Sequence, residues 1–417
     1  MKISKFGKQF TSGAGILSLM DDLGNALAAG GDDMIMMGGG NPGHVPGFQD
    51  IIQDRLLKLA ADKDSFKKLI GVYDPPQGDL AFVDVLADLL RREYGWDVDR
   101  ENIALTNGSQ AGFFLLFNLF AGDYENGEKK KIRLPLAPEY IGYADLGACD
   151  SFFVSNRPQI KLLDDNLFKY HVDFDNIHIG SETGAICVSR PTNPTGNVLT
   201  DQEIAELDIL AKQNEIPLIL DNAYGVPFPG IIYTEAKPMW NENIVVCLSL
   251  SKLGLPAART GIIVARKEIV KAVSGMNAIM NLATGSFGSM LAQDLVETGE
   301  VLNVSQNVIR PFYEGKMKKA VALFHKHLAG TPYKIHNPEG AMFLWLWFKD
   351  MPVSSHELYL RLKERNVLVV SGHFFFPGLD EPWQHEKECI RVTYSQDDEK
   401  VAKGINIIAE EVKKAYS

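Results

Sequence analysis

Lys252 is the residue of this sequence that most clearly could take part in a chemical reaction. It stands in the stretch SLSKLGLPAARTG, residues 249–261, which follows NIVVC, a run typical of a buried strand. Lysine is rarely buried without a partner, and in an apolar site that holds other cations it loses its proton easily. Its amine then becomes a nucleophile toward aldehydes. The alternative is an ordinary strand exit with the ammonium in water. The other polar clusters of the sequence are needed to choose between a reactive lysine and a solvated one.

A second cluster, TNGSQ at residues 106–110, lies between a strand-like run and an apolar helix-like run. Gly108 allows close approach of the backbone, and the free N–H groups of Ser109 and Gln110 at a helix start attract an anion. Asn and Ser are also good helix caps, so a simple cap is the alternative.

Two further clusters follow apolar runs. The segment SRPTNPTGNV, residues 189–198, predicts a rigid turn that holds Asn193 in a fixed pose, although a plain turn explains it too. In PLILDNAYG, residues 217–225, Asp221 ends an apolar run and Tyr224 follows three positions later. A carboxylate at the edge of a core needs a partner, but Asp221 could instead cap the next segment.

Together the clusters supply an anion cradle, a carboxylate, a hydroxyl, an amide and one lysine. A phosphate carries about −1.5 to −2 charges at neutral pH and suits the cradle, and a carboxylate beside a ring nitrogen keeps that nitrogen protonated. Pyridoxal 5′-phosphate combines a phosphate, a ring nitrogen, a phenolic oxygen and an aldehyde. The sequence therefore predicts a pyridoxal-phosphate site. Its anion cradle comprises Gly108, Ser109, Gln110, Ser249 and Arg259.

The elements that must position these clusters alternate along the chain. Apolar strand-like runs are separated by helix-like segments such as residues 200–213, which predicts an α/β fold with a mostly parallel sheet covered on both faces. Ligands bind at the carboxyl ends of such strands, where the clusters lie. The strand-like runs are residues 102–105, 185–189, 216–220, 244–250 and 261–265.

After about residue 303 the pattern changes to a long helical stretch, then strands, then a closing helix rich in Glu and Lys. We therefore expect a three-layer α/β/α large domain over residues 46–311. Residues 1–45 and 312–417 are expected to form a smaller α+β domain.

Several motifs resemble one known family. YDPPQG, TNGSQ, PEYIGY, NPTG, DNAY, SLSK and IRVTY occur in the order found in the aspartate-aminotransferase-like, fold type I family of pyridoxal-phosphate enzymes. The resemblance covers essentially the whole chain. It implies that Lys252 bonds covalently to the aldehyde and that Asp221 pairs with the ring nitrogen. Tyr224 and Asn193 are then the partners of the phenolic oxygen.

The same resemblance assigns the remaining contacts. Tyr140 of PEYIGY matches the aromatic residue that stacks on the ring, while the backbone of Ser109 and Gln110, with Ser249 and Arg259, matches the phosphate site.

Three residues correspond to substrate and subunit contacts in the family. Arg391 matches the arginine that clamps the substrate carboxylate with a two-pronged hydrogen bond, and Gly40 of GGGNPG matches a backbone approach to substrate. Tyr73 of YDPPQG matches a tyrosine that reaches the phosphate from the other subunit. The resemblance therefore implies a homodimer with shared active sites.

The implied activity is that of an aminotransferase with ping-pong kinetics. Stretches such as GGGNP, APEYIGYAD and GHFFFPG resemble a branch that converts L-valine and pyruvate to 3-methyl-2-oxobutanoate and L-alanine. Alternatives are a pyridoxal-phosphate lyase or synthase, an alanine, aliphatic or aromatic aminotransferase of broader specificity, and a non-catalytic sensor domain.

Composition sets limits on the partners. The chain has 417 residues and a formal net charge of −11, which argues against nucleic acid. Its four cysteines are scattered, its longest apolar run is short, and no His or Cys spacing is typical of a metal site. We expect a soluble cytoplasmic protein that binds small amino and 2-oxo acids, with no metal and no membrane contact.

Overall fold

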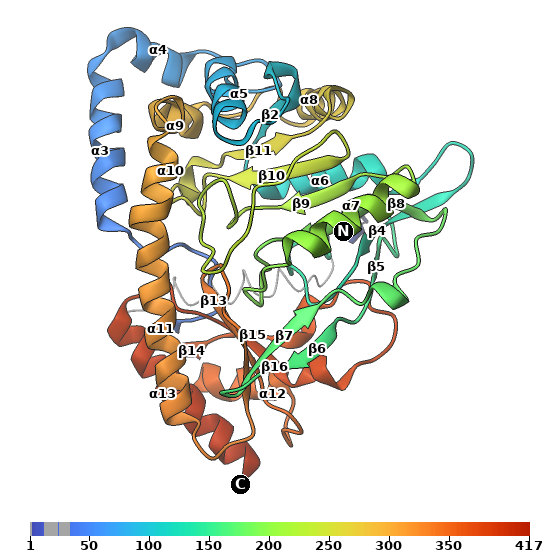
Figure 1. The fold of residues 1–417 in the computed structure, drawn as a ribbon, viewed down its shortest axis with the longest axis vertical. Coiled ribbons are helices and arrows are strands. Elements are labelled where there is room, and N and C mark those ends of the chain that lie inside the picture. Colours follow the sequence, from blue (N-terminus) through green and yellow to red (C-terminus); the bar gives the residue numbers. More distant parts are fainter. Residues whose placement is uncertain (1, 12–23, 25–33) are drawn as a thin grey trace.

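The computed structural model describes residues 2–11, 24 and 34–417, and its largest feature is a sheet of eight strands (Figure 1). Seven strands follow the order β2-β11-β10-β9-β8-β4-β3, and β5 pairs with β4 outside this path. The bounds are β2 Ile103–Thr106, β3 Gly122–Asp123, β4 Lys129–Leu134, β5 Phe153–Ser155, β8 Thr183–Ser189, β9 Leu218–Asp221, β10 Ile244–Ser249 and β11 Gly261–Val264.

The pairing brings the ends of distant strands to one edge. Strands β4, β5, β8, β9 and β10 run parallel, whereas β11 is antiparallel to both β10 and β2. In this register Ser189 lies opposite Asp221, and Ser249 lies opposite Gly261. Gly261 in turn lies opposite Thr106. The four polar clusters of the sequence therefore meet at one edge of the sheet.

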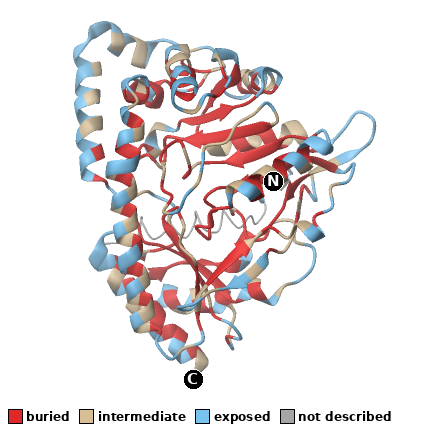
Figure 2. Ribbon diagram, viewed as in Figure 1, coloured by how far each residue is buried: buried red, intermediate tan, exposed pale blue. Residues whose placement is uncertain are grey.

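Alternation along the strands divides the core between two faces. In β10, Val246 and Leu248 belong to one apolar cluster, while Val245 and Cys247 belong to another. Helices α5, α7 and α9 contribute to the first cluster, and α6 and α8 contribute to the second. Figure 2 shows the strands of this sheet as mostly buried. The helix bounds are α5 Leu80–Tyr94, α6 Ser109–Phe120, α7 Asp201–Gln213, α8 Lys267–Asn281 and α9 Phe287–Glu297.

A second sheet has six strands in the order β15-β16-β13-β12-β7-β6. Residues 159–171 form β6 and β7 and stand in the sequence between two strands of the large sheet, β5 and β8. They belong to the second sheet instead, where β6 pairs with β7 and β7 pairs with β12. The two sheets are thus joined through the middle of the chain as well as through its ends. The bounds are β6 Gln159–Leu162, β7 Leu167–His171, β12 Lys334–His336, β13 Phe343–Trp347, β15 Val370–Ser371 and β16 Cys389–Thr393.

The long helical stretch begins earlier than the sequence suggested. Helix α10 is followed by a π-helical turn, Ser305–Ile309, and then by α11, which carries Pro311 at its start. Proline has no N–H to give to the preceding turn, and a π turn accommodates that loss. The other elements are α1 Lys5–Gln9, β1 Ile35–Met36, α3 Pro46–Ala61, α4 Lys63–Gly71, α10 Glu300–Val304, α11 Arg310–His327, α12 Ser355–Glu364, β14 Val367–Leu368 and α13 Asp398–Tyr416.

This architecture confirms the expected fold class: a mostly parallel sheet covered on both faces, next to a smaller α+β unit. The expected domain limits, 46–311 against 1–45 with 312–417, stay a prediction. Residues 12–23 and 25–33 of the expected small domain lie outside the described residues.

Candidate active site

A cavity of about 590 Å³ lies where the strand ends of the large sheet meet the smaller unit. Eleven of the residues singled out in the sequence line it, although they come from seven separate stretches of the chain. They are Gly40, Ser109, Gln110, Tyr140, Asn193, Asp221, Tyr224, Ser249, Lys252, Arg259 and Arg391.

Lys252 follows β10 and points into this cavity. Its Nζ donates a hydrogen bond to the carbonyl oxygen of Gly40 at 2.6 Å and lies 5.2 Å from the ring centre of Tyr224. Burial lowers the pKa of Lys252 to about 8, and the cations Arg391 and Arg259 add to this effect. In mildly alkaline solution Lys252 is therefore a free, uncharged amine in a large fraction of the molecules.

Asp221 ends β9 and is 8% exposed. Its Oδ2 accepts a hydrogen bond from Tyr143 at 2.6 Å, and its Oδ1 accepts the N–H of Ala223 at 2.9 Å. The second bond is the local capping contact that the sequence left open. Burial raises the pKa of Asp221 to about 6, although these hydrogen bonds oppose the rise. Above that pH the cavity contains a carboxylate that a cation can pair with.

The start of α6 lines the cavity with Ser109 and Gln110, and a helix start of this kind suits an anion. Gly108 is the N-cap with a φ of +84°, and no side chain caps this helix. The hydroxyl of Ser109 is buried and has no hydrogen-bond partner among the described residues. A Cβ at Gly108 would overlap the guanidinium of Arg259, so only glycine lets this cation lie against the helix start. Ser249 is buried beside them and accepts the N–H of Ser251 at 3.1 Å.

Arg391 on β16 also lines the cavity. Its Nη1 donates to Asn193 Oδ1 and its Nη2 to the carbonyl oxygen of Gly38, each at 2.7 Å. Its guanidinium lies over Phe343, 4.3 Å from the ring centre, and its Nε is buried without a partner among the described residues. Burial lowers the pKa of Arg391 to about 10. This cation suits a small carboxylate that enters the cavity.

Two residues expected at the site do not line the cavity. Gly108 lies just behind it, against Arg259, as described above. Tyr73 is 81% exposed, and the resemblance assigns it to the site of another subunit. Tyr140 and Tyr224 both line the cavity, and burial raises the pKa of each phenol.

Sequence reasoning missed two buried residues of the PEYIGY stretch. Tyr143 holds Asp221, as described above, and Glu139 is fully buried beside it. Glu139 accepts hydrogen bonds from the N–H of Ser189 at 2.9 Å and from its hydroxyl at 2.6 Å. Burial raises the pKa of Glu139 to about 8, and nearby Asp221 adds to the rise. The only signal in the sequence was an acidic residue inside an otherwise apolar run.

We expect Glu139→Gln to change how stability depends on pH. The folded protein keeps the Glu139 proton up to about pH 8, whereas the unfolded chain loses it near the usual value of 4.5. The folded form thus binds more protons in this window, so Glu139 lowers stability progressively as the pH rises. The apparent Tm of the variant minus that of the unsubstituted protein should increase from pH 5 to pH 8.5.

Glu203→Gln is the matched control, since Glu203 is also a buried glutamate. Burial alone would raise its pKa, but hydrogen bonds from Thr200 and Val172 lower it overall. Its proton is therefore lost below pH 5 in both states, and the Tm difference should stay flat over the same range. A flat difference for Glu139→Gln as well would contradict the prediction.

Among the residues that the structure describes, no cluster of His, Cys, Asp and Glu has the make-up of a metal site. Within the same part of the chain, none of the helices combines the length and apolar character needed to cross a bilayer.

Comparison with known proteins shows which family this sequence matches. The family model for class I and II aminotransferases matches residues 49–408. The sequence is 52% identical to the valine–pyruvate aminotransferase of Escherichia coli over 417 residues, which is 100% of this chain and 99% of the relative. The solved valine–pyruvate aminotransferase of Salmonella typhimurium is 51% identical with a TM-score of 0.89, covering 96% of this chain and 99% of that one. A solved structure from Psychrobacter arcticum is 47% identical with a TM-score of 0.97, covering 100% and 99%.

Proposed function

The chain belongs to the class I and II aminotransferase family, and from this we propose that it converts L-valine and pyruvate to 3-methyl-2-oxobutanoate and L-alanine. The observation that carries the substrate assignment is the 52% identity, over the full length, to a valine–pyruvate aminotransferase. The cavity supports it, since it presents a carboxylate-binding arginine, a free amine and an anion-binding helix start in one place.

The residues present fit pyridoxal 5′-phosphate, the cofactor of this family. The unpartnered hydroxyl of Ser109 and the Arg259 guanidinium against Gly108 form a cradle for a phosphate. Asp221 would hold the ring nitrogen, Tyr224 and Asn193 the phenolic oxygen, and Lys252 the aldehyde carbon. The neighbours of the phosphate and the ring would be Gln110, Ser249 and Tyr140.

When bound, this cofactor supplies an aldehyde that condenses with amines and a ring that withdraws electrons from the substrate's Cα. Lys252 is the base that removes the proton from Cα and later returns one, because its pKa of about 8 leaves roughly a tenth of the amine free at pH 7 and about half of it free at pH 8. Asp221 is the anion that keeps a proton on the ring nitrogen. Arg391 orients the substrate through its carboxylate.

The direct test is product analysis of the purified protein supplied with pyridoxal phosphate, L-valine and pyruvate. We expect L-alanine and 3-methyl-2-oxobutanoate in equal amounts, without ammonia, and parallel lines in double-reciprocal plots. Other small aliphatic amino acids should react as well, since one methylene changes binding by only about 1–3 kcal/mol. Ammonia release would indicate a lyase instead, and equal turnover of aspartate and valine would contradict the aliphatic preference.

A homodimer with shared sites, located in the cytoplasm, forms part of this proposal. The loop that carries Tyr73 is exposed, and Ile279 and Leu282 at the end of α8 are 88% and 61% exposed. Asn277 of α8 donates to the carbonyl oxygen of Pro76 at 2.7 Å, so the two exposed apolar segments belong to one region. A partner subunit would bury them. Four free cysteines suit a reducing compartment.

We expect Arg391→Leu to lower kcat/KM for L-valine and for pyruvate by about 10²- to 10³-fold, since losing one partner of a buried charged contact costs about 2–5 kcal/mol. Arg391→Lys keeps the charge but loses the two-pronged geometry, so its loss should be smaller. Steady-state kinetics with both substrates measures this.

The amine 2-methylpropylamine serves as a control substrate, because it has the valine side chain but no carboxylate. This amine should react slowly, and its rate should be the same in the unsubstituted protein and in Arg391→Leu. A parallel loss with valine and with this amine would mean that Arg391 does not act through the carboxylate.

A further inference from the structure

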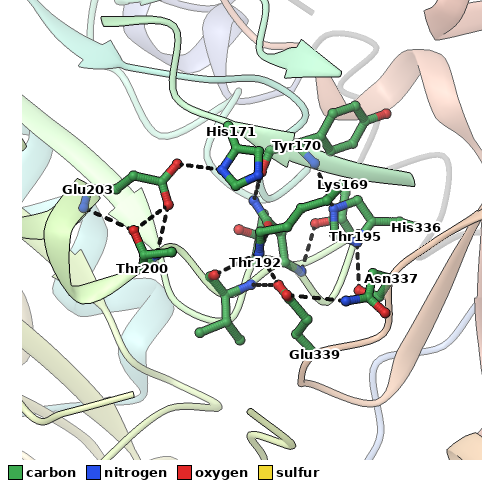
Figure 3. A network of polar contacts seen from close by, with 12 residues as sticks. Lys169, Tyr170, His171, Thr192, Thr195, Thr200, Glu203, His336, Asn337 and Glu339 are labelled. Atoms are coloured by element: carbon green, nitrogen blue, oxygen red, sulfur yellow. Dashed lines mark hydrogen bonds and ion pairs between the residues drawn. The ribbon is translucent and has the colours of Figure 1, made fainter. Parts of the chain in front are cut away.

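A buried ion pair outside the cavity contacts the segment that carries one of the cavity's residues. Lys169 on β7 and Glu339 just before β13 are paired, and their side chains are 10% and 12% exposed (Figure 3). The Lys169 ammonium also donates to Asn197 Oδ1 at 3.1 Å and to the carbonyl oxygen of Val198 at 3.0 Å. Glu339 Oε2 accepts the N–H of Val198 at 3.0 Å. Both charges therefore hold the same short segment of the large domain.

That segment is the turn that carries Asn193. The N–H of Thr192 donates to the carbonyl oxygen of Asn197 at 2.8 Å, which closes the turn around Asn193. Gly196 has a φ of +72°, and a Cβ there would come within 2.6 Å of the carbonyl oxygen of Gly340. The turn thus packs against the residue next to Glu339. A shift of β7 or of the segment before β13 would therefore move Asn193.

The same pair also bears on Arg391. Glu339 lies in the short segment that precedes β13, and Trp345 of β13 lies opposite Arg391 of β16 in the antiparallel register. Asn193 Oδ1 accepts the hydrogen bond from Arg391 Nη1 at 2.7 Å. The two members of this contact therefore sit on elements that Lys169 and Glu339 join.

We propose that Lys169 and Glu339 are positioning residues that set the placement of Asn193 against Arg391, and thereby the affinity of the site for the α-carboxylate of its substrates. This inference rests on the proposed function. Neither side chain lines the cavity, so the pair acts only through Asn193 and Arg391. A buried ion pair often adds little stability over an apolar pair of similar volume, so its stabilising effect alone does not account for its presence.

The test measures binding and kinetics in the holoenzyme variants Lys169→Met and Glu339→Gln. The binding probe is 3-methylbutanoate, which has the carbon skeleton and carboxylate of valine but no amine to react. We expect its Kd, measured by calorimetry, and the KM for L-valine to rise about tenfold, while kcat at saturation changes less than threefold. The KM for 2-methylpropylamine, which has no carboxylate, should stay the same.

A double-substitution cycle separates positioning from general stabilisation. In an Asn193→Ala background, Lys169→Met should change the Kd for 3-methylbutanoate by less than twofold, because the Asn193 side chain that the pair places against Arg391 is gone. Arg365→Met is the control for loss of an ion pair away from the cavity, since Arg365, whose side chain is 32% exposed, donates to the buried Glu411 at 2.8 Å. It should lower the Tm without changing the Kd.

An unchanged Kd in Lys169→Met and in the milder Glu339→Gln, with Tm values lowered as in the control, would overturn the proposal. An equal rise of the Kd with and without Asn193 would overturn it too. If the unsubstituted holoenzyme neither binds 3-methylbutanoate nor forms alanine, the proposed function has failed instead.

Discussion

Replacing Lys252 with alanine is expected to lower kcat for the exchange between L-valine and pyruvate by about 10⁴-fold or more, since positioned proton transfer alone contributes up to about 10⁴-fold. The Lys252 amine lines the cavity together with Asp221 and Arg391, and burial lowers its pKa to about 8. Arg391 and Arg259 are cations and cannot take its place as a base. The rate of product formation and the exchange of the valine α-hydrogen with deuterated water should fall together.

Lys252→Arg is the matched control, because arginine keeps a cation at this position but offers no free amine near neutral pH. It should be as inactive as the alanine variant. Both variants should keep an apparent Tm close to that of the unsubstituted protein, since the hydrogen bond to the Gly40 carbonyl is the only one recorded for this side chain among the described residues. Retained α-hydrogen exchange in either variant would place the base elsewhere.

The arrangement of the site was predictable where it depends on strand ends. Apolar runs that end in Asp221 and Ser249 predict parallel strands, and the ends of parallel strands meet at one edge whatever the loops between them do. Thr106, at the end of β2, reaches the same edge although β11 beside it is antiparallel. The meeting of these residues with Lys252 therefore follows from local sequence patterns.

The remaining features depend on contacts between distant parts of the chain. Residues 159–171 have no local signal for joining β12, which lies more than 160 positions later, and pairing of this kind is set by tertiary packing. The orientation of Glu139 and Tyr143 toward Ser189 and Asp221 is likewise fixed only once the sheet has formed. The role of Tyr73 depends on a second chain and stays a prediction.

Replacing Asp221 with asparagine is expected to lower kcat roughly 10³-fold with little change in fold. Two opposite charges about 4 Å apart at an effective dielectric of 20 attract each other by roughly 4 kcal/mol, and that amount corresponds to about three powers of ten in rate. Asparagine can still accept the Ala223 N–H, and the Tyr143 hydroxyl can rotate to accept from its amide. The substitution thus removes a charge and almost nothing else, so the KM for L-valine should change only a few fold.

Tyr143→Phe tests the same carboxylate with its charge left in place. It removes one hydrogen bond to a charged group, worth about 1.5–3 kcal/mol, so kcat should fall by about 10- to 10²-fold. Because the Tyr143 hydroxyl lowers the pKa of Asp221, its removal lets burial raise that pKa further above about 6. In the holoenzyme the attraction of roughly 4 kcal/mol to the protonated ring nitrogen outweighs that rise and keeps the carboxylate ionised, so the loss of kcat in Tyr143→Phe should be similar at pH 6 and at pH 8. If Asp221→Asn instead kept kcat within tenfold of the unsubstituted protein, the negative charge at the end of β9 would have no part in the reaction, and Asp221 would be a capping residue alone.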